Sequence, residues 1–299
     1  MLPDPKSLLI FNLIVLRLPL RHGFGHPAWE SQIVRYIYPM KLTLPILCLL
    51  ALSSTALHAV IISVNFQGRG STDNPATAAG APIPAGSPAG VMNVSNFNNI
   101  SAAQFSPGGA ATTFTSPALN SSTGAATAIT FNMTAADSWN SESGNATPNA
   151  ILLNGIIKAN ANQLTVPLNI LGLTPGNTYT LDLYTTNNGP GGIQPDTRYT
   201  ATNGVSTFHQ GAQPGTAHLA TPGFILGTNT VAGTYPRANY VEFKGVVGPS
   251  GAINLNYTWI AGISDGAGIS GFQLNVVPEP TSMGLMGLGF LLAARRRRR

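Results

Sequence analysis

Charged side chains are scarce in this sequence. Asp, Glu, Lys and Arg together make up 8% of the 299 residues, whereas a soluble domain averages about 25%. Coiled coils, charged disordered tails and the surfaces of ordinary cytosolic enzymes all need more of these residues. The low charge therefore excludes these three classes.

Cysteine is almost absent as well, since Cys48 is the only one. A single cysteine excludes a disulfide framework and any metal site built from several cysteines. Glycine and proline, with 33 and 23 residues, stay below the roughly 25–30% that marks a disordered low-complexity chain. The chain is thus expected to fold without covalent cross-links.

The basic residues that are present gather at the two ends of the chain. Although the formal net charge is +5, the segment from Val60 to Pro280 has five basic residues against eight acidic ones, a net charge of −3. It has no basic stripe that could follow a phosphate backbone. Nucleic-acid binding is therefore not expected.

Residues 40–59 have the layout of a secretory signal peptide. Met40 and Lys41 precede an apolar run at residues 42–52, and small residues follow it. A basic start, an apolar core and a small-residue cleavage site are typical of such signals. Cleavage is expected after Ala56 or Ala59, with the general secretion machinery as partner.

Residues 1–39 fit poorly into this signal, because they contain a second apolar run, residues 8–16, followed by arginines and prolines. The sequence favours Met40 as the start of translation and residues 1–39 as upstream sequence. A long leader or a second membrane helix is the alternative. The mass of the precursor distinguishes these possibilities.

The chain ends in an apolar segment that is short for a membrane span. Residues 281–294 number 14, about 21 Å as a helix, against the roughly 30 Å of a hydrocarbon core. Five arginines follow, which would stay on the cytoplasmic side: Arg295, Arg296, Arg297, Arg298 and Arg299. The pattern predicts a short transmembrane helix and places the preceding domain outside the inner membrane.

The tripeptide Pro278, Glu279 and Pro280, the short Gly- and Leu-rich helix and the terminal arginines closely resemble the PEP-CTERM sorting signal of Gram-negative bacteria. The resemblance covers residues 278–299. In that family the membrane protease exosortase recognises the Pro-Glu-Pro region and removes the tail, so the resemblance implies that role for this tripeptide. It also implies a transient membrane anchor, followed by release to the cell surface or the extracellular biofilm matrix.

Residues 60–277 are the expected passenger domain, and their pattern is that of β-strands. Apolar and polar side chains alternate along residues 253–259 and 272–276, as in half-buried antiparallel strands. No window shows a helical period of useful length. Strands are predicted at residues 59–66, 127–133, 163–170, 178–186, 240–247, 253–259 and 269–277.

Turn residues such as Pro175 and Gly176 separate these runs, and the Ala-, Pro- and Gly-rich residues 71–90 are expected to form a long surface loop. Many short strands with turns between them predict an all-β fold, an antiparallel β-sandwich. In overall texture it resembles the jelly-roll, galactose-binding-like passengers often found ahead of PEP-CTERM tails.

The sequence contains no convincing catalytic motif. Residues 262–266 match the G-x-S-x-G elbow around Ser264, but that elbow needs a following helix and a later His, and neither is present. His209 and His218 lie beside a Gly- and Pro-rich segment at a spacing without a metal-ligand signature, so both are expected to be exposed loop residues. We expect no catalytic residue, no metal and no cofactor.

Asp137, Trp139 and Glu142 lie close together in what is expected to be a loop. A Trp beside carboxylates can stack a sugar ring while the acids accept its hydroxyls, so these three residues are a candidate sugar or Ca²⁺ site. The alternative is a loop with a half-buried Trp. Trp259, at an inward position of an alternating strand, is expected in the core.

Together these features predict an exported, non-enzymatic surface or matrix protein that is structural or associated with exopolysaccharide. One alternative is a secreted carbohydrate-active enzyme or carbohydrate-binding module. Another is an uncleaved, tail-anchored periplasmic protein. Two close carboxylates in a pocket would favour the enzyme.

Overall fold

The computed structural model describes residues 59–68, 80–102, 105, 110–140, 147–159, 163–186, 196–202, 204–211, 224–261 and 268–279. Fourteen strands and one short helix lie within them, so the chain is mostly β, as predicted. The expected signal peptide, apart from Ala59, and the expected membrane helix lie outside these residues. Within them, no helix is long and apolar enough to cross a membrane.

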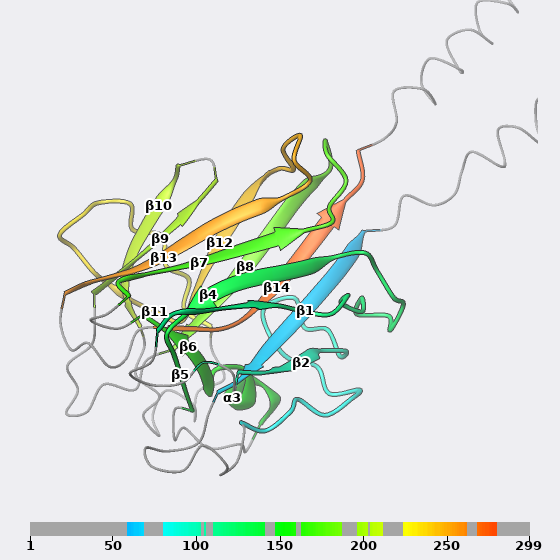
Figure 1. Ribbon diagram of the computed structural model, residues 1–299, viewed down its shortest axis with the longest axis horizontal. Helices are drawn as coiled ribbons and strands as arrows, with labels where there is room; N and C mark the ends of the chain where they lie inside the picture. Colours follow the sequence, from blue (N-terminus) through cyan, green and yellow to red (C-terminus); the bar gives the residue numbers. More distant parts are fainter. Residues whose placement is uncertain are drawn as a thin grey trace, which may run out of the picture. The chain divides into compact units, whose positions relative to one another are not determined.

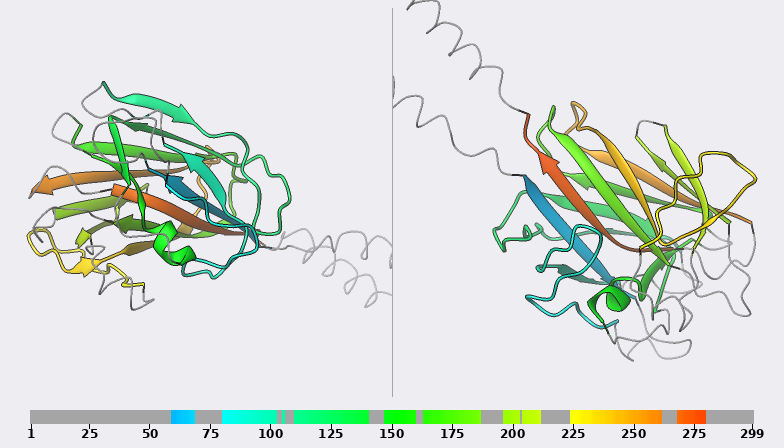
Figure 2. Two further views of the ribbon diagram at one scale, coloured as in Figure 1. Left: turned by 90° about the horizontal axis from the view of Figure 1, so that it is seen from below. Right: turned by 180° about the vertical axis from the view of Figure 1, so that it is seen from behind.

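The strands form two seven-stranded sheets (Figures 1 and 2). The first sheet has the order β12–β8–β14–β1–β2, with β6 beside β14 and β5 beside β6. Its strands are β1 (Val60–Gln67), β2 (Asn98–Ser101), β5 (Asp137–Asn140), β6 (Gly155–Lys158), β8 (Thr178–Thr186), β12 (Tyr240–Val246) and β14 (Gly268–Val277).

The second sheet has the order β11–β10–β9–β13–β7–β4–β3. Its strands are β3 (Thr112–Thr115), β4 (Thr130–Ala135), β7 (Thr165–Leu171), β9 (Asp196–Ala201), β10 (Ser206–Gly211), β11 (Arg237–Ala238) and β13 (Ile253–Ala261).

Both sheets are mixed, because β1 pairs with β2 and β10 pairs with β11 in parallel. The prediction of a purely antiparallel sandwich is wrong at these two places. Parallel neighbours need a connection that returns to the same end of the sheet, usually of a dozen or more residues. The chain has such lengths between these strands, at residues 68–97 and 212–236.

One hydrophobic core joins the two sheets. Alternate side chains of β1, β8 and β14 from the first sheet and of β4, β7 and β13 from the second are buried in it. At its centre, the Phe131 ring of β4 meets Phe66 of β1 and Phe272 of β14 edge to face, at centroid distances of 5.5 and 5.8 Å. Because these rings come from both sheets, their contacts hold the sheets against each other.

A second, smaller cluster lies on the outer face of the first sheet. It joins Tyr184 of β8 to Ile83 and Ala89 and to the helix α3 (Pro148–Leu152), which lies near the end of β1 (Figure 2). Residues 80–97, here called the covering segment, therefore bury part of this face. Residues 80–90 form no strand, as expected, yet they do not simply lie on the surface.

The seven predicted strands are confirmed as β1, β4, β7, β8, β12, β13 and β14, with ends within three residues of those expected. Trp259 packs partly buried against the core. The jelly-roll resemblance stays a prediction.

Candidate functional site

The sorting tripeptide begins where the last strand of the first sheet ends. β14 ends at Val277, and Pro278 and Glu279 follow directly. Proline has no backbone N–H to continue the ladder, which accounts for the end of the strand. Val277 and Glu279 are exposed, so the chain is accessible here. Pro280 and the five terminal arginines lie outside the described residues.

The two ends of the β domain lie next to each other. Val60 pairs with Val276 in the antiparallel β1–β14 pair, so the start of β1 and the end of β14 share one end of the first sheet (Figure 1). Both strands contribute to the core. Cuts after Ala59 and after Val277 would therefore remove only segments outside the paired strands.

Asp137 and Trp139 lie on β5 rather than in a loop, and Glu142 lies outside the described residues. Asp137 Oδ2 is 3.1 Å from Lys158 Nζ, with both side chains 6% exposed. The same Nζ lies 5.1 Å from the centroid of the Trp139 ring. A buried ammonium partner thus already neutralises the Asp137 carboxylate. The sugar or Ca²⁺ site at these residues stays a prediction.

His209 is fully buried, so the prediction of an exposed loop histidine is wrong. It lies on β10, its ring stacked on Tyr199 at a centroid distance of 4.8 Å, and its Nε2 is 3.1 Å from Thr185 Oγ1. Burial lowers its pKa to about 3. The alternation of β10 turns this side chain inward, which the Gly- and Pro-rich surroundings do not indicate. His218 lies outside the described residues.

Two carboxylates that the sequence does not single out face each other on the outer side of the first sheet. Asp182 of β8 is opposite Glu242 of β12. Asp182 is 2% exposed, and its Oδ1 has no hydrogen-bond partner among the described residues. Burial and then the charge of Glu242 raise the pKa of Asp182 to about 6, while Lys244 acts in the opposite direction.

A glutamine and a tyrosine hold the covering segment on the first sheet. Gln273 of β14 donates from Nε2 to Ala89 O at 3.1 Å and accepts at Oε1 from Met92 N–H at 3.0 Å. Tyr184 Oη accepts from Val91 N–H at 2.6 Å and donates to Gln273 Oε1 at 2.5 Å. These bonds satisfy backbone groups of a segment that belongs to neither sheet.

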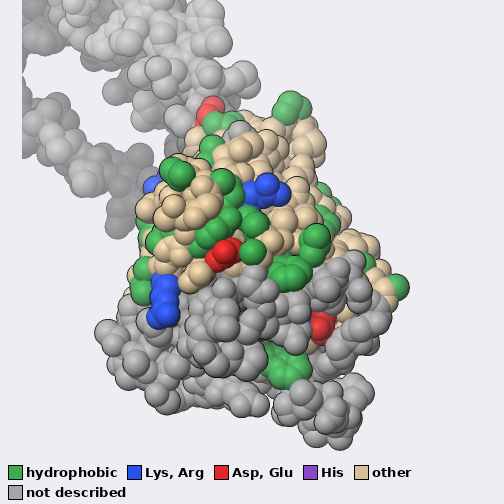
Figure 3. All heavy atoms as spheres, turned by 90° about the vertical axis from the view of Figure 1, so that its left-hand side faces the viewer, with side chains coloured by type: hydrophobic (Ala, Val, Ile, Leu, Met, Phe, Trp, Pro, Cys, Tyr) green, Lys and Arg blue, Asp and Glu red, His purple; other side chains and the backbone are tan. Residues whose placement is uncertain are grey.

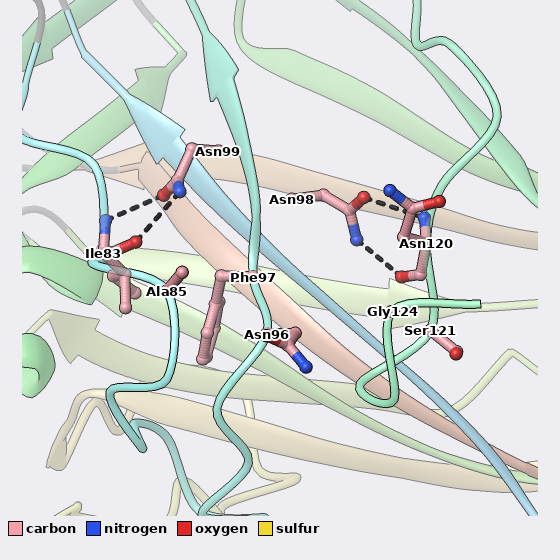
Figure 4. Close-up of a pocket in the computed structure, with 9 residues that line it drawn as sticks. All are labelled: Ile83, Ala85, Asn96, Phe97, Asn98, Asn99, Asn120, Ser121 and Gly124. Carbon is pink, nitrogen blue, oxygen red and sulfur yellow. Dashed lines mark hydrogen bonds between the residues drawn. The ribbon is translucent and has the colours of Figure 1, made fainter. Parts of the chain in front are cut away.

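A pocket of about 210 Å³, here called the asparagine pocket, opens beside the covering segment (Figure 4). Asn99 fixes one wall, because its amide accepts from Ile83 N–H at 2.8 Å and donates to Ile83 O at 3.1 Å. Asn98 fixes the other wall in the same way, with both bonds to the Asn120 backbone at 2.8 Å. The sequence signal for this pocket is the run of asparagines around Phe97, which motif searches do not weigh.

Metal-ligand clusters were not expected. Within the part of the chain that the structure describes, no three His, Cys, Asp or Glu side chains gather as metal ligands. Ser264 and its glycine-rich surroundings lie outside that part.

Comparison with known proteins bears on the tail of the chain. A family model of the PEP-CTERM protein-sorting motif matches residues 276–299. No curated protein matches the chain. Among solved structures, the enzymatically active domain of tailspike protein 4 from bacteriophage CBA120 is 11% identical over 57% of this chain and 18% of that chain, with a TM-score of 0.17. A likeness this distant does not bear on fold or function.

The matched residues 276–299 include the whole tail, residues 278–299, for which the sequence predicts a sorting signal. It indicates an exported protein with a membrane-associated C-terminal sorting signal of Gram-negative bacteria, and it implies processing by exosortase. The chain is therefore a protein with a PEP-CTERM sorting motif at residues 276–299.

Proposed function

We propose that this chain is a non-enzymatic protein of the cell surface or extracellular matrix, that exosortase cuts it at the Pro-Glu-Pro region, and that its β domain associates with exopolysaccharide. The observation that carries the proposal is the sorting motif at residues 276–299, which begins as β14 ends. Since β14 is complete before Pro278, removal of the tail leaves the paired strands and the core intact.

The surface of the domain suits contact with a neutral polymer. On the face in Figure 3, charged side chains are few and stand apart among polar and apolar ones. On the second sheet, Asn132, Asn169 and Asn254 form a row across β4, β7 and β13. Amide groups both donate and accept hydrogen bonds, as sugar hydroxyls do, so such a surface can bind a glycan without ion pairs.

The facing carboxylates of Asp182 and Glu242 do not favour a glycosidase. Such an enzyme places both carboxyl groups beside the scissile bond of a bound sugar. Asp182 is only 2% exposed, and neither residue lines the asparagine pocket. Although Glu242 is exposed, a sugar cannot reach both carboxyl groups in the described structure, which supports the non-enzymatic proposal.

Replacing the sorting tripeptide tests the proposal. We expect the parent chain, made in cells that contain exosortase, to lose its tail and leave the membrane. The variant Pro278→Ala, Glu279→Ala, Pro280→Ala should keep the tail and remain membrane-bound, as measured by fractionation and intact mass.

The matched control is Pro236→Ala, which removes an exposed proline just before β11, the edge strand of the second sheet, and should leave processing unchanged. If the triple variant is cut and released like the parent, recognition of the tripeptide is wrong. If parent and triple variant both remain full-length in the membrane, the chain is the tail-anchored alternative.

A further inference from the structure

We infer that the asparagine pocket binds one sugar unit of a neutral glycan chain. This inference rests on the proposed association with exopolysaccharide, and it adds the site and the chemical class of the ligand. Nine residues line the pocket, and none of them carries a charge: Ile83, Ala85, Asn96, Phe97, Asn98, Asn99, Asn120, Ser121 and Gly124 (Figure 4).

The neutral lining selects the class of ligand. A phosphate, a uronate or a metal ion would lose hydration in the pocket without meeting a counter-charge, which is unfavourable. A sugar hydroxyl both donates and accepts, and a side-chain amide offers two donors and a carbonyl acceptor. The hydrogen-bonding capacity of the pocket therefore matches an uncharged, hydroxyl-rich ligand.

The four asparagines divide into two roles. The amides of Asn98 and Asn99 are occupied by the backbone of the walls. Asn120 is exposed, and its side-chain amide makes no hydrogen bond to any described residue. Asn96 donates from Nδ2 to Ser122 O at 2.5 Å, and its Oδ1 makes no hydrogen bond to any described residue. Asn96 and Asn120 are thus the groups left to bind a ligand.

Phe97 supplies a flat apolar surface to the same lining. Its ring is half-buried, packed on one part against the cluster below the covering segment and lining the pocket with the rest. The face of a sugar ring that carries C–H groups is apolar, and it buries well against an aromatic ring. One aromatic face with two free amides is enough to orient a single sugar ring.

The size and rigidity of the pocket fit one unit of a chain. Its volume of about 210 Å³ lies below the roughly 300–1,000 Å³ of pockets that enclose drug-sized ligands. Paired amide bonds hold Ile83 and Asn120 in the two walls, so little ordering is needed when a ligand enters. The remaining sugars of the chain would lie outside the pocket.

Ligand-observed saturation-transfer NMR on the full chain in detergent tests the inference. The probes are cellohexaose, maltohexaose, mannohexaose and an N-acetylglucosamine hexamer, with polygalacturonate as the charged comparison. We expect at least one neutral probe to bind, with saturation strongest on the C–H face of one ring, and polygalacturonate not to bind. Absence of binding by every neutral probe, or binding of polygalacturonate alone, would overturn the inference.

Variants locate the binding. Phe97→Leu keeps apolar packing in the cluster but loses the flat ring, and it should lower the affinity for the glycan probe by at least about 10-fold. Asn120→Ala removes an exposed side chain and should lower the affinity for the probe by about 3- to 10-fold. Ser250→Ala, at an exposed position in the turn after β12, the edge strand of the first sheet opposite β2, is the matched control and should not change binding.

If Phe97→Leu lowers the thermal unfolding midpoint of the protein, only Asn120→Ala is used to judge binding. Unchanged binding in Asn120→Ala would place the ligand elsewhere and overturn the inference. Tail processing of the same variants separates this inference from the sorting proposal. Normal processing without glycan binding contradicts the pocket alone, whereas glycan binding by a chain that keeps its tail contradicts the sorting alone.

Discussion

At the scale of single residues, burial favours the neutral form of two side chains and so shifts their pKa values in opposite directions. The pKa of Asp182 is raised to about 6, and that of His209 is lowered to about 3. Between about pH 4 and 6, the folded state keeps a proton on Asp182 that the unfolded chain has released. Below about pH 6.5, the unfolded chain takes up a proton on His209 that the folded state does not. Stability therefore falls with rising pH through Asp182 and with falling pH through His209.

Replacing Asp182 isolates the first of these effects, because His209 is unchanged in both proteins. We expect Asp182→Asn and the parent to have the same unfolding free energy near pH 4, where Asp182 is protonated. At pH 7 the unfolding free energy of the variant should be higher by about 1–2 kcal/mol, a figure that allows for solvent screening. Urea unfolding at the two pH values measures the difference. Glu279→Gln, at an exposed position after β14, should show no such change. An Asp182→Asn protein less stable than the parent at pH 7 would contradict the account.

At the scale of elements, the covering segment depends on a glycine at one position. Gly90 has a φ of +77°, and a Cβ there would lie 2.2 Å from Gln273 Oε1 and 2.7 Å from Tyr184 Oη. Gly86 also has a positive φ, +81°, but a Cβ there would meet nothing within 4 Å. The two positions separate backbone strain from overlap with the groups that hold the segment.

The pair of variants Gly90→Ala and Gly86→Ala tests this dependence. Gly86→Ala should lose about 1–2 kcal/mol of unfolding free energy through its left-handed backbone. Gly90→Ala should lose roughly 2 kcal/mol more, because it also displaces buried hydrogen-bonding groups of Gln273 and Tyr184. Denaturant unfolding followed by circular dichroism compares them. Equal losses would show that the segment is not held at this point.

The β5–β6 pair depends on the ion pair of Asp137 and Lys158. Lys158→Met should lower the unfolding free energy by about 3–5 kcal/mol, because it leaves a buried carboxylate without its partner. Adding Asp137→Asn should recover part of this loss, since the uncompensated charge disappears. A double variant that is less stable than Lys158→Met would contradict this view of the pair, and denaturant unfolding of the three proteins decides.

Strands with clear alternation were predictable, and the others were not. The period of two along β13 and β14 identified both strands. β6 is buried at all four residues, so its sequence shows no alternation. In β9, Thr197 faces inward with Tyr199 and Ala201, and a polar residue on the buried side hides the pattern. Short strands of this kind are defined by the neighbours they pair with.

The candidate sites likewise divide into those with a local sequence pattern, which were predictable, and those formed only by the fold. The sorting tripeptide is local in sequence, so it was fully predictable. Asp182 lies opposite Glu242 and Gln273 of the neighbouring strands, 60 and 91 residues away along the chain, and no local pattern indicates its burial. The asparagine pocket joins residues 83–99 with residues 120–124, and only the fold brings these two stretches together.

At the scale of the whole molecule, the two ends of the chain differ in charge from the segment between them. The basic residues concentrate at the two ends, whereas the segment from Val60 to Pro280 has a net charge of −3. Those ends join the domain side by side, through the pairing of Val60 with Val276. Under the proposed processing, removal of the segment after Val277 would leave the paired strands and the core intact.

The intact mass of the protein recovered from outside the cell tests the central claim most directly. In cells with exosortase, we predict a chain that begins after Ala56 or Ala59 and ends within or next to Pro278–Pro280, without the terminal arginines. In otherwise identical cells that lack exosortase, the tail should remain and the protein should stay with the membrane. A released chain that still carries its five terminal arginines, or identical masses and locations in the two strains, would contradict the claim.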